Sequence, residues 1–140
     1  MTQEHRVSRV VLLVLDAFMA LSAIGGGIAL MLGALPIPIS YLEGSPFDSY
    51  VVPGVILAVA LGGVNAWAFV LLLRRRPFAL FAGAIAAFDG LIWIVVELVW
   101  IPFGFLHAVY FTVPLIQAGF VMLALGLGTW RRRRTPAAVG

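Results

Sequence analysis

The sequence predicts an all-α integral membrane protein, in which the whole chain, 1–140, forms one antiparallel four-helix transmembrane bundle with both termini inside. The first reason is composition: of the 140 residues, 63% are hydrophobic and 11% are charged, and the mean hydropathy is +1.10. A soluble domain has about 25% charged residues, because its surface faces water. The second reason is the presence of four apolar runs of about 20 residues or more, the length that crosses a bilayer as a helix. The third is that all nine basic residues are Arg and lie at the ends of these runs.

The first helix is predicted over 10–35. Arg6 and Arg9 precede its apolar run, and Pro36 ends it. The run is about 39 Å long at 1.5 Å per residue, whereas the apolar region of a signal peptide has only about 7–15 residues. We therefore expect this segment to stay in the protein as a tilted membrane helix.

An outer loop is predicted over 36–50. It carries acidic residues but no basic one, and loops without Lys or Arg are typical of the outer side of a membrane. We expect the loop to pack down on the bundle, because four of its side chains need apolar cover: Tyr41, Leu42, Phe47 and Tyr50.

Three more helices are predicted, over 51–73, 78–101 and 105–130. Pro53 falls in the first turn of the second helix, where its missing N–H is harmless. Arg residues and Pro77 make a short turn before the third helix, and Pro102 lies in a tight hairpin before the fourth. Connections this short make sequential helices antiparallel neighbours.

The Arg clusters predict how the helices are oriented. Cytoplasmic loops carry an excess of Lys and Arg, and each cluster directly ends an apolar run, which suits a topology signal better than a nucleic-acid site. Both termini, and the turn between the second and third helices, are therefore expected in the cytoplasm, and no nucleic-acid partner is expected. We also expect contact with anionic lipid headgroups at these residues: Arg74, Arg75, Arg76, Arg131, Arg132, Arg133 and Arg134.

Each predicted helix places one polar residue on a stripe of small residues. At about 100° per residue, Asp16 falls in line with Ala20 and Gly27, and the other helices repeat this pattern. Small residues let membrane helices approach closely, so the polar residues are expected to meet inside the bundle. Together with a neighbouring Trp they form the predicted ligand-binding or proton-binding site: Asp16, Asn65, Asp89, Trp93 and Gln117.

Asp16 and Asp89 leave two interpretations open. Every Arg lies at a membrane boundary, so neither carboxyl has a basic neighbour within the membrane. A carboxylic acid in this setting is commonly protonated, and a hydrogen bond from it to Asn65 or Gln117 would be purely structural. Ionisable residues within membrane spans are also frequently functional, and the alternative is a site for a proton, a cation or a small amphiphile.

A second candidate site lies near the outer ends of the last two helices. Glu97 and His107 bracket the predicted hairpin. They are either a hydrogen-bonded pair that closes the hairpin or a catalytic acid and base. No metal or other cofactor is expected, because the chain has no Cys and because His5 falls on the opposite side of the membrane from His107.

Two stretches resemble a signature of small four-transmembrane-helix bacterial membrane proteins. In 40–63, an L-x-G-S-P-F run is followed by an aromatic residue and then by P-G at a helix start. The end of the third helix has an acid, followed by F-x-x-L-H and Y-F. The matching residues are Leu42–Phe47, Tyr50, Pro53, Gly54, Glu97, Phe103, Leu106, His107, Tyr110 and Phe111. The resemblance implies a four-helix membrane fold but lends no catalytic residues, because no activity is assigned to that group.

The same resemblance implies a bacterial source, and the use of Arg without Lys alongside abundant Ala, Gly and Val agrees with it. The expected location is the bacterial plasma membrane.

Three functions remain open at this point. The first is binding or transport of a proton, a cation or a small amphiphile in the acidic interior of the bundle, with the chain acting alone, as a homo-oligomer or as an accessory subunit. The second is a membrane enzyme that acts on a lipid or isoprenoid near the outer leaflet, with Glu97 and His107 as acid and base. The third is a structural partner subunit of a membrane complex, in which the polar residues only hold the helices together.

Overall fold

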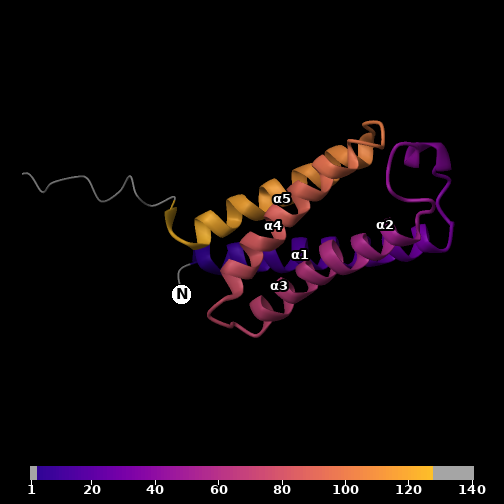
Figure 1. Ribbon diagram of the computed structural model, residues 1–140. Coiled ribbons are helices and arrows are strands. Elements are labelled where there is room, and N and C mark those ends of the chain that lie inside the picture. The colour runs from indigo at the N-terminus through magenta and orange to yellow at the C-terminus, as the bar shows by residue number, and fades with distance from the viewer. Residues whose placement is uncertain (1–2, 128–140) are drawn as a thin grey trace, which may run out of the picture.

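Four long helical segments make up the fold (Figure 1). The computed structural model describes residues 3–127, so Arg131, Arg132, Arg133 and Arg134 and the end of the fourth predicted helix lie outside the described residues. The helical elements are α1 (Gln3–Met31), η1 (Ile39–Leu42, a short 3-10 helix), α2 (Val51–Ile56), η2 (Leu57–Gly62, a π-helix), α3 (Gly63–Leu73), α4 (Ala79–Glu97) and α5 (Phe105–Ala124).

Four segments of the described chain are long and apolar enough to cross a membrane: His5–Met31, Val51–Leu73, Ala79–Glu97 and Phe105–Ala124. The second of these is built from α2, η2 and α3, which follow one another without a break. The prediction of an all-α, multi-pass membrane protein is therefore confirmed.

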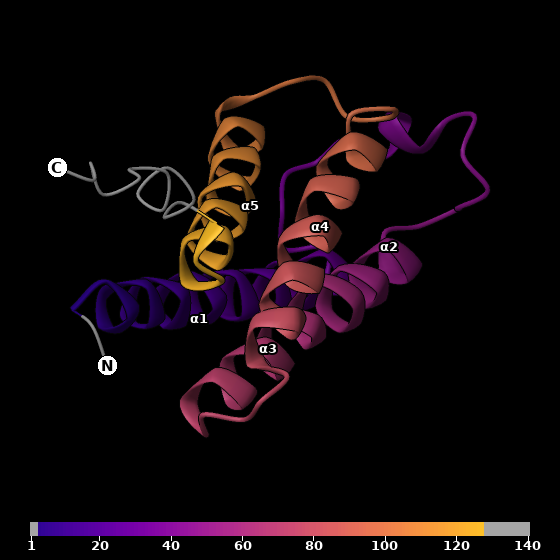
Figure 2. The same cartoon turned by 90° about the vertical axis from the view of Figure 1, so that its left-hand side faces the viewer.

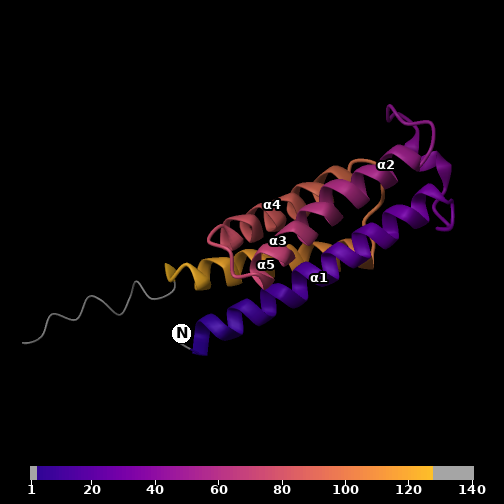
Figure 3. The ribbon, with the colours of Figure 1, turned by 90° about the horizontal axis from the view of Figure 1, so that it is seen from below.

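The four segments pack in a ring. Each one contacts the next in the chain, and α1 also contacts α5, which closes the ring. Figure 3 shows α1 running alongside α2 and α3. Figure 2 shows α4 and α5 side by side, with both inclined to α1. The interior of the ring is where polar side chains from different helices can meet.

Large apolar side chains cover the outside of the ring, and many small ones lie inside it, together with a few large ones such as Met19 and Leu61. Leu21 is 73% exposed and Phe105 is 81% exposed, whereas Ala68, Ala82 and Ala86 are completely buried. This distribution is unfavourable in water, but it suits a surface covered by lipid tails and helices that associate through small residues.

Two helices approach closely where Gly27 of α1 meets Gly54 of α2. A Cβ atom on Gly27 would lie 2.5 Å from the Gly54 carbonyl oxygen, and one on Gly54 would lie 2.6 Å from the Gly27 carbonyl oxygen. Neither position has room for a side chain. The two glycines therefore let the backbones of α1 and α2 touch, as small residues do in membrane helix pairs.

The predicted bounds of the first helix, 10–35, are wrong at both ends. α1 begins at Gln3, because the polar segment before Val10 contains no Gly or Pro to stop a helix. It ends at Met31 in a Schellman motif, in which Gly33 adopts a left-handed φ of 64° and the Ala34 N–H donates to the Ala29 carbonyl at 2.9 Å. Glycine is the usual residue at this position.

The last two predicted helices are too long. α4 ends at Glu97 rather than at position 101, and the residues after it form a turn that leads into Pro102. Proline disfavours a helical conformation in the residue before it. α5 ends at Ala124, because Gly126 takes a left-handed φ of 79° and its N–H donates to the Leu123 carbonyl.

Candidate functional site

Three of the predicted polar residues form a hydrogen-bonded cluster in the middle of the ring. Asp16 comes from α1, Asn65 from α3 and Gln117 from α5, and all three are completely buried. The Gln117 amide nitrogen donates to Asp16 Oδ1 at 2.7 Å and to Asn65 Oδ1 at 3.0 Å. One side chain thus connects three helices.

The π-helical segment η2 provides a further contact of this cluster. The Asn65 amide nitrogen donates to the Leu61 carbonyl at 2.9 Å, and Leu61 lies in η2. π-helical turns are rare and are often found near functional sites. Here the turn places a backbone acceptor beside the polar cluster.

Two oxygen atoms of the cluster remain without a partner among the described residues: Asp16 Oδ2 and Gln117 Oε1. Both are buried. A proton or a small cation would supply the donor or charge that these acceptors lack. However, the three residues line neither of the two cavities described below. The cluster is therefore well placed to hold the helices together, and it lies outside both of these cavities.

Asp89 and Trp93, the other two residues of the predicted intramembrane site, lie apart from the cluster. Asp89 is only partly buried and makes no hydrogen bond or ion pair with another described residue. Trp93, one turn further along α4, lines a cavity together with Glu97. The structure thus divides the predicted site into three parts: the central cluster, Asp89 on its own, and a cavity that Trp93 lines.

That cavity, the Glu97 cavity, has a volume of about 560 Å³ and lies at the end of the bundle near the first loop. Residues of α1, η2, α4 and α5 form its walls, together with the loop segment Leu35–Pro38, the hairpin between α4 and α5, and Tyr41. Most of the lining is apolar. The side chains in the lining that carry polar atoms are Ser22, Tyr41, Trp93, Glu97, His107 and Tyr110. A largely apolar cavity with a few convergent polar groups is the usual form of a small-molecule site.

His107 presents a buried donor at this cavity. Its Nδ1 accepts a hydrogen bond from the Gly104 N–H at 3.1 Å, which caps the start of α5. An acceptor nitrogen carries no proton, so the proton of the neutral ring is on Nε2. Nε2 is buried and has no partner among the described residues. Unpaired buried donors are rare and call for a partner.

Glu97 brings a carboxyl group to the same cavity. It is the last residue of α4, and its side chain lines this cavity as that of His107 does. No hydrogen bond joins these two side chains directly. The predicted pair is thus at one cavity, but it does not close the hairpin by a mutual hydrogen bond.

The first loop contributes to the cavity wall in part. Tyr41 lines the cavity, and Tyr41, Leu42, Phe47 and Tyr50 are all partly buried. The Tyr50 hydroxyl donates to the Pro38 carbonyl at 2.7 Å, which ties the start of the loop to its end. Glu43, Gly44 and Asp48 remain exposed.

Comparison with known proteins adds no family. Neither the protein-family models, nor the curated proteins, nor the solved structures gave a match. The resemblance of the 40–63 and 97–111 stretches to small bacterial membrane proteins therefore stays a prediction. The cavities are the remaining guide to function.

Proposed function

We propose that this chain is a membrane protein that binds a single-chain amphiphile in the Glu97 cavity. The observation that carries the proposal is the unpaired Nε2–H of His107 at a cavity whose walls are otherwise mostly apolar. A hydroxyl head group can accept a hydrogen bond from His107 and donate one to Glu97. The chain of the ligand would then cover the apolar walls formed by Leu57, Leu61 and Ile94.

Transport of a proton or cation through the central cluster is less well supported. Asp16, Asn65 and Gln117 are sealed on all sides and line neither cavity. The Glu97 cavity, in contrast, has a size within the range of about 300–1,000 Å³ that is typical of ligand sites. The Glu97 cavity is therefore a better-supported ligand site than the central cluster, because it has room for a ligand.

The orientation of the chain is part of the proposal. The Glu97 cavity is at the opposite end of α4 from the turn that carries Arg74, Arg75 and Arg76. If the positive-inside rule holds for this chain, the cavity faces the outer leaflet of a bacterial plasma membrane. A ligand would then enter from that leaflet or from the outer solution.

Native mass spectrometry of the purified protein with farnesol, an isoprenoid alcohol, tests the proposal. We expect one farnesol to bind saturably, and the related hydrocarbon farnesene to bind about tenfold more weakly. A tenfold change corresponds to about 1.4 kcal/mol, within the range for one hydrogen bond to a buried group. Equal binding of the two probes would contradict the role of His107 and Glu97.

Two adjacent glycines give a matched pair of variants for the same experiment. Gly26 lines the cavity, and a Cβ there would meet only Leu57, at 3.7 Å. Gly25 is exposed, and a Cβ there would meet nothing within 4 Å. Gly26→Leu should fill the cavity and abolish farnesol binding, whereas Gly25→Leu should leave it unchanged. Equal binding by both variants would show that farnesol occupies another place.

A membrane enzyme acting on a lipid or isoprenoid is the second candidate, because Glu97 and His107 line one cavity. In that case Glu97 would act as base and the His107 Nε2–H as acid. The step that these two groups can perform on an alcohol is loss of water: Glu97 takes a proton from the carbon chain, a C=C bond forms, and the hydroxyl protonated by His107 leaves as water. Farnesol extracted after incubation should then be lighter by one water with the wild type but not with Glu97→Gln. An unchanged mass with the wild type would favour simple binding.

A further inference from the structure

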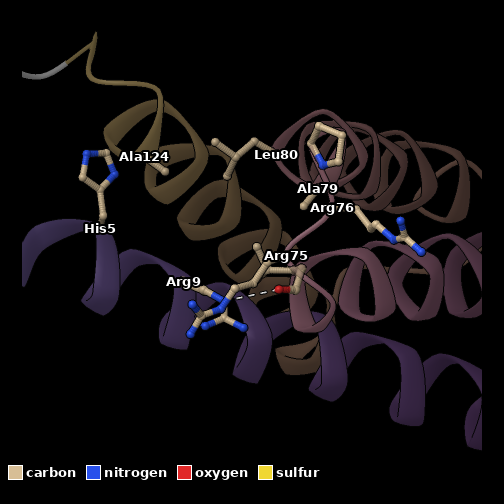
Figure 4. A pocket seen from close by; sticks show the side chains of 9 residues that line it. His5, Arg9, Arg75, Arg76, Ala79, Leu80 and Ala124 are labelled. Carbon is tan, nitrogen blue, oxygen red and sulfur yellow. Dashed lines mark hydrogen bonds between the residues drawn. The ribbon is translucent and has the colours of Figure 1, made fainter. Parts of the chain in front are cut away.

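A second cavity, the arginine cavity, lies at the other end of the bundle and is about 430 Å³ in volume. The first turns of α1, the turn between α3 and α4, and the end of α5 surround it (Figure 4). Its apolar lining includes Leu72, Leu80 and Ala124. Its polar lining is entirely basic or titratable to a cation: His5, Arg9, Arg75 and Arg76. Among the described residues that line it, none is acidic.

Arg9 is held in place at this cavity by backbone carbonyls. Its Nε donates to the Leu72 carbonyl at 3.2 Å and its Nη2 to the Leu73 carbonyl at 3.1 Å, and the first of these bonds is drawn in Figure 4. A guanidinium has five N–H donors, so three remain for another partner. The two bonds fix the group between α1 and the end of α3.

Arg75 occupies a backbone position at which glycine is usual. Its φ is 51°, in the left-handed region. The N–H of Arg75 donates to the Leu72 carbonyl and that of Arg76 to the Leu71 carbonyl, which is the Schellman pattern at the end of α3. A side chain at this position of the motif is strained. An Arg at this position adds a charge to the cavity, although a Gly would give a less strained turn.

The guanidinium groups of Arg75 and Arg76 have no partner within the described chain. Neither makes a side-chain hydrogen bond or an ion pair with another described residue. Figure 4 shows the side chains of Arg9 and Arg75 close together at the cavity, whereas the guanidinium group of Arg76, another lining residue, points away from them. Two cations this close repel one another unless an anion lies between them.

We propose that the arginine cavity binds a phosphate group. Guanidinium groups donate pairs of parallel hydrogen bonds to phosphate oxygens, and those of Arg9 and Arg75 lie close together at this cavity. The apolar side chains of the lining suit the start of an acyl chain, so the phosphate can be that of an anionic phospholipid, and a soluble phosphate has the same chemistry. This inference does not depend on the ligand of the Glu97 cavity.

The test compares three variants that each remove one Arg from the same turn. Arg75→Gly removes a cavity residue and gives the left-handed position its preferred residue, so the fold should be at least as stable as the wild type. Arg74→Gly removes the same charge from a neighbour that is exposed and does not line the cavity. Arg76→Gln is a second cavity variant that leaves the turn backbone unaltered.

The binding of phosphatidylglycerol and of phosphatidylcholine is measured by native mass spectrometry, and inorganic phosphate is added in a separate thermal-shift series. We expect Arg75→Gly and Arg76→Gln to weaken binding of the phosphate ligand by up to about tenfold, in keeping with the strength of charged hydrogen bonds. Arg74→Gly, which removes only a general attraction of the turn for anionic headgroups, should weaken it clearly less, and an equal loss in all three variants would contradict a site in the cavity. Selective binding of phosphatidylglycerol identifies the lipid as the source. A stabilisation by inorganic phosphate, without preference for the lipid, identifies a soluble phosphate. Equal binding by the wild type and all three variants would overturn the proposal.

Discussion

The Gln117 amide nitrogen donates to Asp16 Oδ1 at 2.7 Å, although the two residues are 101 positions apart in the sequence. The same nitrogen donates to Asn65. This arrangement joins α5 to both α1 and α3 through one side chain in an apolar interior. It makes Gln117 the residue on which the central cluster depends, because Asp16 and Asn65 make no hydrogen bond to each other.

Gln117→Leu should destabilise the fold. The substitution leaves Asp16 Oδ1 and Asn65 Oδ1 as buried acceptors without donors, and an orphaned buried group costs about 1–3 kcal/mol. Hydrogen bonds between membrane helices average only about 0.6 kcal/mol, so we expect a loss of about 1–2 kcal/mol in the free energy of unfolding. Denaturation in mixed micelles with increasing dodecyl sulfate measures it.

Thr112→Val is the matched control for this measurement. Thr112 lies in the same helix, and its hydroxyl donates to the Ala108 carbonyl one turn earlier, at an exposed position. The isosteric Val should change the unfolding free energy by less than about 0.5 kcal/mol. If Gln117→Leu unfolds at the same dodecyl sulfate concentration as Thr112→Val, the cluster does not stabilise the bundle.

Gly27→Ala and Gly25→Ala should have effects of opposite sign. A Cβ on Gly27 would lie 2.5 Å from the Gly54 carbonyl oxygen and 2.8 Å from the Ala58 Cβ, whereas one on Gly25 would meet nothing. We expect Gly27→Ala to lower the free energy of unfolding by about 1–3 kcal/mol through overpacking. Gly25→Ala should raise it by about 0.5–1 kcal/mol, because alanine favours a helix. The same micelle denaturation distinguishes them, and a stabilising Gly27→Ala would refute the close contact of α1 with α2.

The fold was largely predictable because its strongest signals are local. The apolar runs, the Arg clusters and Pro36, Pro77 and Pro102 mark where the chain crosses and turns. Two of the errors came from glycine: Gly33 and Gly126 end helices within apolar segments, where hydropathy alone predicts that the helix continues. The π-helical turn of η2 left no recognisable signal in its apolar sequence.

The polar cluster was only partly predictable, and the reason is the order of the helices around the ring. Periodicity places Asp16, Asn65, Asp89 and Gln117 on small-residue stripes, but it does not say which stripes meet. α4 packs mainly against α3 and α5, so Asp89 does not reach Asp16. The cavities could not be predicted, because empty space depends on helix inclination and loop packing rather than on residue type.

Tyr50→Phe should loosen the first loop. The Tyr50 hydroxyl donates to the Pro38 carbonyl at 2.7 Å, and a net hydrogen bond of about 0.5–1.5 kcal/mol corresponds to a change of roughly two- to tenfold in an opening equilibrium. Cleavage at the exposed Glu43 by a Glu-specific protease should become faster by this factor. Tyr41→Phe, which removes a hydroxyl without a hydrogen bond to another described residue, should leave the cleavage rate unchanged.

The pKa of the Tyr50 hydroxyl predicts how the first loop responds to high pH. Burial raises the pKa of the Tyr50 hydroxyl above its usual value of 10.0, and Tyr41 adds a smaller effect in the same direction. Because the pKa is raised in the folded state, the stabilisation is complete below pH 10 and is lost as the pH rises through the raised value. Tyrosinate absorbance should show one late-titrating group that Tyr50→Phe removes. A wild-type curve identical to that of Tyr50→Phe in this range would contradict the contact.

The orientation of the chain can be tested by labelling introduced cysteines, because the sequence contains no Cys of its own that would also be labelled. Asp48 is exposed in the first loop, and Arg74 is exposed in the turn between α3 and α4. The positive-inside rule predicts that a membrane-impermeant maleimide labels Asp48→Cys in intact bacterial cells and labels Arg74→Cys only after the cells are permeabilised. The reverse pattern would place the Glu97 cavity toward the cytoplasm and the arginine cavity outside. The ligand of the Glu97 cavity would then come from the inner leaflet rather than the outer one, while both binding sites would stay the same.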